Sequence, residues 1–381
     1  MKEFDRNLLP DLLMAEDGSR IDTAQKWEEI RRPEIIRFFQ DKVFGRFPEH
    51  AYSISYRTEY SNENALDGRA ICETVYVCIN GPLGEFTYPF FMFIPKCSHP
   101  VAATLLISNR SKEENLDITR KIKSDFWPVE EIVNRGVAAC AFYACDVDTD
   151  ADDGFQNGVH TIFNEKHGRT DWATLASWAW GAMRIMDYLE RDVRIDANHV
   201  AVVGQSRGGK TAILAGACDL RFAAVYSSCS GCMGAALSRF KDGEHVRDIV
   251  SAFPYWFCDE FRSYSDREKD MPFDQDALLA TIAPRMIYVT SATMDDWADP
   301  DAELAAVCMT RPIYRLYGLD GLPEETMHID KMHLLEKPLL TDKVGYHRRI
   351  GVHDLTTADW MRFLDFFLRR IEETHSRADI L

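Results

Sequence analysis

The chain has 381 residues, of which 61 are Asp or Glu and 44 are Lys or Arg, so its formal net charge is −17 at neutral pH. This negative balance repels the phosphates of nucleic acids and anionic lipid surfaces, so we expect neither as a partner. Apolar residues make up 46% of the chain, as in an ordinary globular protein, and no run of about eighteen apolar residues indicates a transmembrane helix.

The cysteines and the N-terminus favour a cytoplasmic protein. Ten cysteines lie scattered along the chain, and one C-x-x-C pair occurs, at Cys229 and Cys232. No second pair and no clustered histidines accompany it, so we expect no zinc site. The first residues lack the apolar stretch of a secretion signal. We therefore predict a cytoplasmic location with reduced, buried thiols.

The first hundred residues combine one helical pattern with a set of strands. From residue 23 to 44, apolar side chains recur at helical spacing, and we expect Pro33 to break or kink this helix. Residues 51–96 alternate like strands on either side of a Gly81-Pro82 turn. This pattern predicts antiparallel strands that open a sheet.

From about residue 100 onward, strands and helices alternate, which is typical of a parallel sheet with helices on both faces. No internal repeat is visible. We therefore predict a helical N-terminal extension at residues 1–50, followed by a single α/β domain at residues 51–381. The expected strands are 101–107, 137–143, 200–203, 222–228, 286–290 and 312–316; the expected helices are 129–134, 171–189 and 358–371; a long loop and a long insertion are expected at 146–167 and 230–272.

One stretch in the middle of the chain carries a candidate nucleophile. The apolar residues 200–203 are typical of a buried strand, and residues 211–217 of a tightly packed helix. Between them, Gly204-Gln205-Ser206-Arg207-Gly208 has the form G-x-S-x-G. In a strand, sharp turn and helix, this motif exposes its serine above the sheet edge, and the glycines let strand and helix approach each other. The pattern predicts Ser206 as a nucleophile.

The same residues also fit a phosphate-binding loop. Gly204 to Thr211 spells G-x-x-x-x-G-K-T, and this motif likewise follows a strand and opens a helix. A nucleotide hydrolase would place it after an early strand and end another strand with a magnesium-binding Asp. Here half of the chain precedes Lys210, and the next strand ends in Tyr226-Ser227-Ser228. The serine nucleophile is favoured, with a P-loop nucleotide hydrolase as the weaker alternative.

A serine nucleophile needs a histidine base and an acid that orients it. In the α/β-hydrolase order, the acid and then the histidine follow the serine. Asp295 and Asp296 come after the strand at 286–290, on the side where such sheets build their sites, and we prefer Asp295. His353 lies in a short loop before the last helix and is preferred to His347 as the base.

Other polar and aromatic residues have structural interpretations. We expect Asp299 and Asp301 to cap the helix that begins near Pro300. The core is expected to hold Trp172, Trp178 and Trp180, and the surface His160 and His167.

The central motif and its surroundings resemble one family of enzymes. Gly204 to Lys210 is similar to the G-x-S-R-x-G-K signature of the glucuronoyl esterases, a family of carbohydrate esterases. The resemblance covers about residues 100–372 and implies an α/β-hydrolase fold, a three-layer sandwich around a mostly parallel sheet. It continues in Trp178-Ala179-Trp180-Gly181, Met271-Pro272-Phe273-Asp274-Gln275, Ala283-Pro284-Arg285, Trp297-Ala298-Asp299-Pro300 and Gly351-Val352-His353-Asp354-Leu355.

The resemblance implies a serine carboxylic-ester hydrolase that forms an acyl-enzyme and needs no metal or organic cofactor. Its implied substrates are esters of glucuronic or 4-O-methyl-glucuronic acid, as in xylan–lignin linkages, so the expected partner is a small or oligosaccharide uronate ester. Arg207 is implied to stabilise the oxyanion beside backbone N–H groups. Lys210 is implied to bind sugar hydroxyls, Trp297 to pack near the sugar and Glu244 to hydrogen-bond it.

Two positions depart from the family pattern. Many members carry the triad acid just before the Ser230-Gly231 pair, where this chain has Cys229, and usually Cys or His where it has Gln205. A thiol cannot serve as a carboxylate, whereas other members take the acid from the loop after the next strand, where Asp295 lies. An esterase for another ester, such as an acetylated sugar, is the alternative function.

Overall fold

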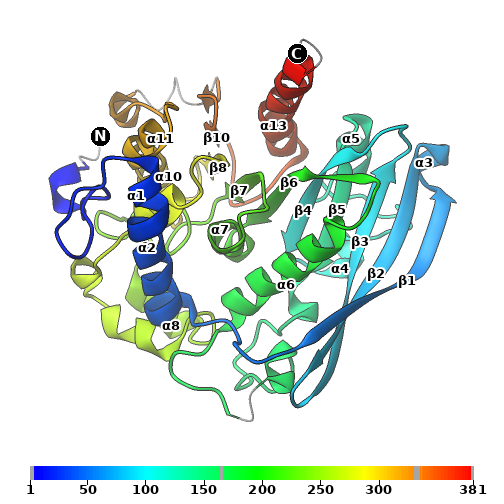
Figure 1. Ribbon diagram of the computed structural model, residues 1–381, viewed down its shortest axis with the longest axis horizontal. Helices are drawn as coiled ribbons and strands as arrows, with labels where there is room; N and C mark the ends of the chain where they lie inside the picture. The colour runs from blue at the N-terminus through cyan, green and yellow to red at the C-terminus, as the bar shows by residue number, and fades with distance from the viewer. Residues whose placement is uncertain (1–3, 164–165, 330–334, 336, 379–381) are drawn as a thin grey trace.

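The structure of the protein, a computed structural model, describes residues 4–163, 166–329, 335 and 337–378. Its described strands are β1 (Ser53–Asn64), β2 (Ala70–Gly81), β3 (Gly84–Pro95), β4 (Val101–Ser108), β5 (Ala138–Tyr143), β6 (Ile195–Gln205), β7 (Ala224–Ser228), β8 (Met286–Ala292), β9 (Leu339–Leu340) and β10 (Val344–Arg349). They form one twisted sheet in the order β1-β2-β3-β5-β4-β6-β7-β8-β10-β9 (Figure 1).

The centre of this sheet is parallel and its two edges are antiparallel. β5, β4, β6, β7, β8 and β10 run in one direction. β1, β2 and β3 form the antiparallel opening that the sequence predicts, and β9 pairs antiparallel with β10 at the other edge. The described helices are α1 (Ala24–Lys26), α2 (Arg32–Phe39), α3 (Ala65–Gly68), α4 (Lys112–Asn115), α5 (Val129–Asn134), α6 (Thr174–Leu189), α7 (Arg207–Cys218), α8 (Val246–Ala252), α9 (Gln275–Ala280), α10 (Pro300–Met309), α11 (Arg311–Leu316) and α13 (Thr357–Ala378).

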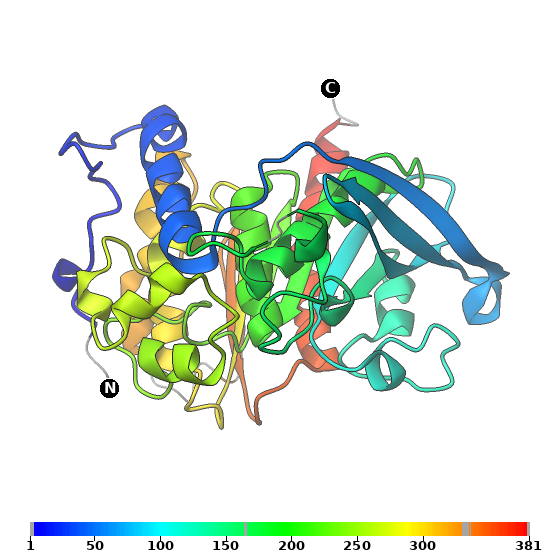
Figure 2. The same cartoon turned by 90° about the horizontal axis from the view of Figure 1, so that it is seen from below.

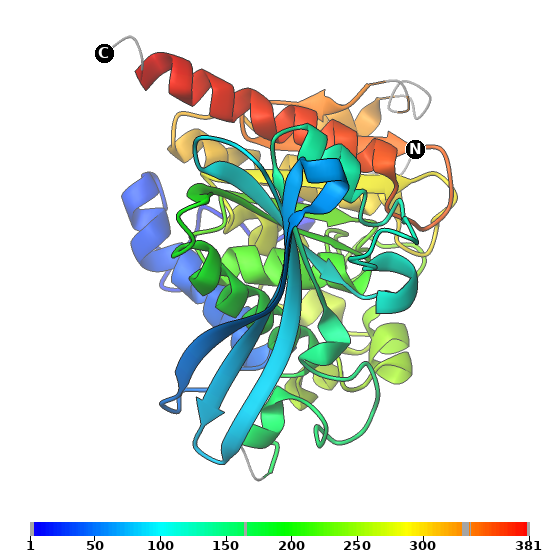
Figure 3. The ribbon, with the colours of Figure 1, turned by 90° about the vertical axis from the view of Figure 1, so that its right-hand side faces the viewer.

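Helices cover both faces of the sheet, as its apolar strands require. Val200 and Val202 of β6 belong to the buried cluster that contains α6 and α7, whereas Ala201 and Val203 belong to the cluster that contains α5 and α13. Successive side chains of a strand point to opposite faces, so a strand covered on both sides shows an unbroken apolar run. Figure 3 shows α13 along the outer side of the sheet, near α5. The predicted α/β-hydrolase fold is confirmed.

The N-terminal segment is helical from residue 24 to 44 and continues through Pro33. α1 and α2 are joined by the π-helical turn η2 (Trp27–Arg31), and a second π-helical turn, η3 (Gln40–Phe44), follows. The expected break does not occur, because Pro33 lies at the start of α2 and the wider turn before it accommodates the missing N–H. Figure 2 shows this segment beside the insertion, at the opposite end from β1 and β2. That residues 1–50 form a separate extension stays a prediction.

Two elements differ from the sequence prediction. Residues 312–316, expected as a strand, belong to the helix α11, where Pro312 occupies one of the first positions and therefore favours a helix. β10 was not expected, because its buried positions include the ionisable side chains of His347 and Arg348. No described helix combines the length and the apolar character needed to cross a membrane.

Part of the loop expected at 146–167 packs inward, although its residues 151–157 remain largely exposed. His160 is only 2% exposed, and its ring centroid lies 4.8 Å from that of Trp172. His167 is half-buried and stacks on Phe155 at 3.9 Å, and burial lowers the pKa of this histidine. The expected surface position of both histidines is wrong, because the loop folds over the aromatic cluster. The expected core positions are confirmed for Trp172, Trp178 and Trp180.

The two aspartates expected as helix caps have different roles. Asp299 precedes α10 and accepts the backbone N–H of Ala302 at 3.1 Å, which confirms it as a cap. Asp301 lies inside the first turn and forms an ion pair with Arg348 at 2.8 Å. The expectation for Asp301 is therefore wrong, since its carboxylate connects α10 to β10.

Candidate active site

Ser206 stands alone between the end of β6 and the start of α7. Its backbone has φ 59° and ψ −128°, a conformation that non-glycine residues rarely adopt, and its N–H donates to the carbonyl of Ser228 at 2.8 Å. A Cβ on Gly204 would lie 2.0 Å from the carbonyl oxygen of Gly208, so the turn requires glycine there. The N–H groups of Gly209 and Lys210 donate to the carbonyl of Ser206, whereas those of Arg207 and Gly208 come before any acceptor within α7 and can therefore stabilise an oxyanion.

This turn is too short for the alternative phosphate-binding loop. β6 ends at Gln205 and α7 begins at Arg207, so one residue separates strand from helix. Lys210, which would reach for a phosphate, instead donates from its ammonium to the carbonyl of Ser230 at 2.5 Å. The P-loop interpretation is wrong, because a strand that leads so directly into a helix leaves no loop to wrap a phosphate.

The structure brings the preferred acid and base together. Nδ1 of His353 lies 2.6 Å from a carboxylate oxygen of Asp295, across 58 positions of sequence. Asp295 is buried and the His353 side chain is 43% exposed, so the pair reaches from the protein interior to the pocket surface. Asp296 is exposed, and His347 is buried among other partners. The geometry thus favours Asp295 and His353, whose catalytic roles stay predictions.

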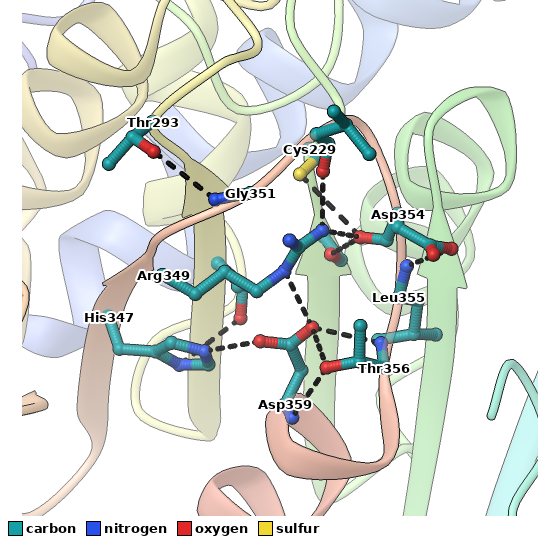
Figure 4. A network of polar contacts seen from close by, with 12 residues as sticks. Cys229, Thr293, His347, Arg349, Gly351, Asp354, Leu355, Thr356 and Asp359 are labelled. Atoms are coloured by element: carbon teal, nitrogen blue, oxygen red, sulfur yellow. Dashed lines mark hydrogen bonds and ion pairs between the residues drawn. The ribbon is translucent and has the colours of Figure 1, made fainter.

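A buried ionic network holds the loop that carries His353 (Figure 4). The Arg349 guanidinium donates to the carbonyl oxygens of the residues on either side of His353, at 2.7 and 2.8 Å. Asp359 pairs with Arg349 at 2.9 Å and with Nε2 of His347 at 2.8 Å. Although burial opposes it, the hydrogen bond from His347 keeps the pKa of Asp359 below its usual value, and burial lowers the pKa of His347. His347 thus connects Asp359 to the hydroxyl of Tyr288, which lies 2.9 Å from its Nδ1.

The candidate residues line one pocket of about 340 Å³ at the carboxyl ends of the strands. Lys210 is nearly fully buried, with its ammonium 3.9 Å from the Glu244 carboxylate. Trp297 is 57% exposed on the rim, where its carbonyl accepts from Lys241 at 3.1 Å and from the N–H of Glu244 at 3.1 Å. The lining residues are Ser206, Arg207, Lys210, Cys229, Ser230, Gly231, Glu244, Phe253, Trp256, Asp295, Trp297, Ala298 and His353.

Asp150 contacts Arg207 at the edge of the site, and no sequence pattern predicted this contact. Its carboxylate pairs with Nε of Arg207 at 2.9 Å and accepts from Nε1 of Trp256 at 2.7 Å and from the hydroxyl of Tyr255 at 3.1 Å. The Arg207 guanidinium also lies 5.5 Å from the centre of the Trp256 ring. No spacing signal identifies Asp150, because its partners come from the insertion and from α7. Together these contacts fix the orientation of the Arg207 guanidinium, which is expected to stabilise the oxyanion.

We expect Asp150→Asn to lower kcat on an ester by about tenfold to a hundredfold, with a smaller change in KM. The amide removes the negative charge that faces Arg207 at 2.9 Å, and the hydrogen bonds that the charged carboxylate accepts from Trp256 and Tyr255 are each worth about one to two powers of ten. Steady-state kinetics with a thermal melt measure this. Asp152→Asn, two residues along on the exposed loop, is the matched control and should behave like the wild type. Equal kcat values for both variants would contradict the role of Asp150.

Cys229 directly follows β7, next to the pair of Asp295 and His353. Its backbone adopts φ 47°, its N–H donates to the carbonyl of Thr290 at 2.7 Å, and it lines the pocket. Burial, reinforced by the carboxylates of Glu303 and Asp295, raises the pKa of this thiol well above its usual value. Cys229 is thus an uncharged neighbour of Asp295. Gln205, the other position that departs from the family pattern, is also buried.

The family model described as fungal glucuronyl esterase matches residues 111–318 of the chain. A carbohydrate esterase from an unknown prokaryotic organism is 33% identical over 389 residues, which cover 94% of this chain and 88% of that protein. A 4-O-methyl-glucuronoyl methylesterase from Neurospora crassa is 32% identical, covering 82% of this chain and 74% of its own length.

A similar fold is found among solved structures. The glucuronoyl esterase from Solibacter usitatus superimposes with a TM-score of 0.86 at 31% identity, covering 97% of this chain and 98% of that one. An esterase from a marine bacterial metagenome, described as promiscuous, superimposes with a TM-score of 0.81 at 32% identity, covering 96% of this chain and 99% of that one.

Proposed function

The chain belongs to the glucuronoyl esterase family of carboxylic ester hydrolases, and we propose that it cleaves esters of 4-O-methyl-glucuronic or glucuronic acid with Ser206 as the nucleophile. One observation carries the proposal. A single pocket joins Ser206, His353 and Asp295 to the cationic and aromatic side chains expected to hold the sugar. An acyl pocket for acetate alone would need no buried lysine and carboxylate beside the serine.

In the proposed reaction His353 removes the proton of Ser206, and the serine oxygen attacks the ester carbonyl. Asp295 holds Nδ1 of His353 and stabilises the imidazolium that forms. The first N–H groups of α7 and the guanidinium of Arg207 stabilise the tetrahedral oxyanion. The alcohol leaves with the proton from His353, and water then hydrolyses the acyl-enzyme by the same route. The residues named here supply every proton transfer.

The substrate is tested by comparing a benzyl ester of glucuronic acid with a simple aryl acetate. A higher kcat/KM for the glucuronate ester is the expected result, because only this substrate presents hydroxyls to the buried Lys210 and Glu244. Hydrolysis of the acetate alone would retain the serine mechanism and contradict the uronate substrate. Hydrolysis of the acetate is the second outcome to consider, because one similar solved structure is described as a promiscuous esterase.

We expect Lys210→Met to raise KM for the glucuronate ester by about tenfold or more and to leave the aryl acetate unchanged within about twofold. Lys210 donates a charged hydrogen bond within the pocket, and losing one to a sugar hydroxyl costs about this much. Lys42→Met, which removes an exposed lysine paired with Glu260, is the matched control. A parallel loss on both substrates would indicate damage to the site rather than lost sugar binding.

We also propose that the protein works in the cytoplasm, on small uronate esters released from xylan-type polymers. All ten cysteines are free thiols, and six of them are buried, as expected for a reducing compartment. Paired cysteines in the purified protein, or activity outside the cells that make it, would contradict this location.

A further inference from the structure

Three metal-binding groups meet beside the nucleophile. The Sγ of Cys229, a carboxylate oxygen of Asp295 and a ring nitrogen of His353 all lie within 4.8 Å of one another. They come from the end of β7 and from the loops after β8 and β10, and all three line the pocket that contains Ser206. Across the ranges that the structure describes, no other three histidine, cysteine or acidic side chains converge in this way.

The combination of these groups selects a particular class of cation. Thiolate, imidazole and carboxylate are the ligands of Zn²⁺ and related thiophilic ions, whereas Mg²⁺ and Ca²⁺ prefer oxygen ligands alone. Three protein ligands leave the fourth tetrahedral position open, here toward the pocket. The thiol of Cys229 supplies the third ligand, beside the carboxylate of Asp295 and the imidazole of His353.

We propose that Cys229, Asp295 and His353 form an inhibitory site for Zn²⁺ or another thiophilic divalent cation. Bonds form from the metal to sulfur, nitrogen and oxygen; the thiol proton passes to water, the imidazole proton of His353 moves from Nδ1 to Nε2 by exchange with water, and nothing is oxidised or reduced. Nδ1 of His353 already faces Asp295 at 2.6 Å, so a cation held between them replaces their hydrogen bond. A histidine bound in this way can no longer serve as the base for Ser206.

The surroundings of the thiol explain why such a site can be reversible. Cys229 is buried, and the carboxylates of Glu303 and Asp295 place negative charge near it. A bound cation supplies the compensating charge that a thiolate needs. Metal binding does not require turnover, so the inference goes beyond the proposed function.

The binding test uses Co²⁺ as a spectroscopic probe on the full-length protein. A thiolate ligand gives cobalt a charge-transfer absorption band, and we expect this band in the wild type and its loss in Cys229→Ser. The matched control is Cys97→Ser, because Cys97 is exposed and its Sγ lies 3.0 Å from Nε2 of His99, a second place where cobalt could meet a thiol. A band that persists in Cys229→Ser, or disappears in Cys97→Ser, overturns the proposal.

The functional test measures ester hydrolysis against Zn²⁺ concentration, each variant being compared with its own metal-free rate. We expect the half-inhibitory concentration to rise by at least about tenfold in Cys229→Ser, a chelator to restore the wild type, and Mg²⁺ to have no effect. Equal inhibition of wild type and Cys229→Ser overturns the site. A protein that binds cobalt through Cys229 but hydrolyses no ester would contradict the proposed function and leave the metal site supported.

Discussion

Replacing Ser206 with alanine is expected to lower kcat on a glucuronate ester by at least about 10,000-fold and to leave the melting temperature unchanged. Ser206→Ala removes only the hydroxyl group from the turn, and the hydrogen bond from the backbone N–H of residue 206 to the carbonyl of Ser228 is retained. Without the nucleophile, the oxyanion donors and the sugar contacts support only a small residual rate. Steady-state kinetics and calorimetry on both proteins measure the two expectations.

The control for this experiment is the other serine in the pocket wall. The Ser230 hydroxyl lies 2.8 Å from that of Ser227 and accepts the N–H of Ala235 at 2.8 Å, so it is engaged in structural hydrogen bonds. Ser230→Ala should keep kcat within about tenfold of the wild type. If Ser206→Ala kept substantial activity, or if Ser230→Ala were the inactive variant, Ser206 would not be the nucleophile.

Replacing Asp295 with asparagine is expected to lower kcat by about a thousandfold to ten-thousandfold. The carboxylate accepts from Nδ1 of His353 at 2.6 Å and thereby presents the other ring nitrogen to Ser206 as the base. An amide in this place can donate to Nδ1 and select the wrong tautomer. Cys229, buried and neutral beside the pair, offers no carboxylate that could compensate.

Asp296→Asn is the matched control for the acid, because the exposed Asp296 is the immediate neighbour of Asp295. Its kcat should stay within about twofold of the wild type, as for an ordinary surface substitution. Measuring both variants on the same ester separates the two candidates. A severe loss in Asp296→Asn with little change in Asp295→Asn would reverse the choice, and two mild effects would place the acid outside this loop.

Apolar runs were the part of the fold that local patterns described well. The run from Val200 to Val203 predicted a strand buried on both faces, and the glycines after it predicted the turn at Ser206. The region 312–316 shows the limit of such patterns. The apolar pattern of a short segment with Ile313 and Tyr314 fits strand and helix equally well, and the helix is favoured by Pro312 in its first turn and by the burial of both side chains.

Local sequence patterns did not predict the strand with buried charges or the contacts of the long loop, for a different reason. β10 carries Arg348 and Arg349 at buried or nearly buried positions, which is tolerable because Asp301 and Asp359 reach them from α10 and α13. Whether these arginine charges can be buried in a strand therefore depends on aspartates far away in the sequence. The same holds for Asp150, whose three partners lie 57 or more positions further along the chain.

The sequence alone determined the α/β alternation, the nucleophile turn and the order of serine, acid and histidine, because each depends on residues that are neighbours along the chain. The tertiary structure placed Asp295 rather than Asp296 against His353, buried His160, and brought Asp150 to Arg207 and Cys229 to the pair of Asp295 and His353. These features arise where the carboxyl ends of several strands meet. Contacts there form between segments far apart in sequence, and no local period or motif encodes their distances.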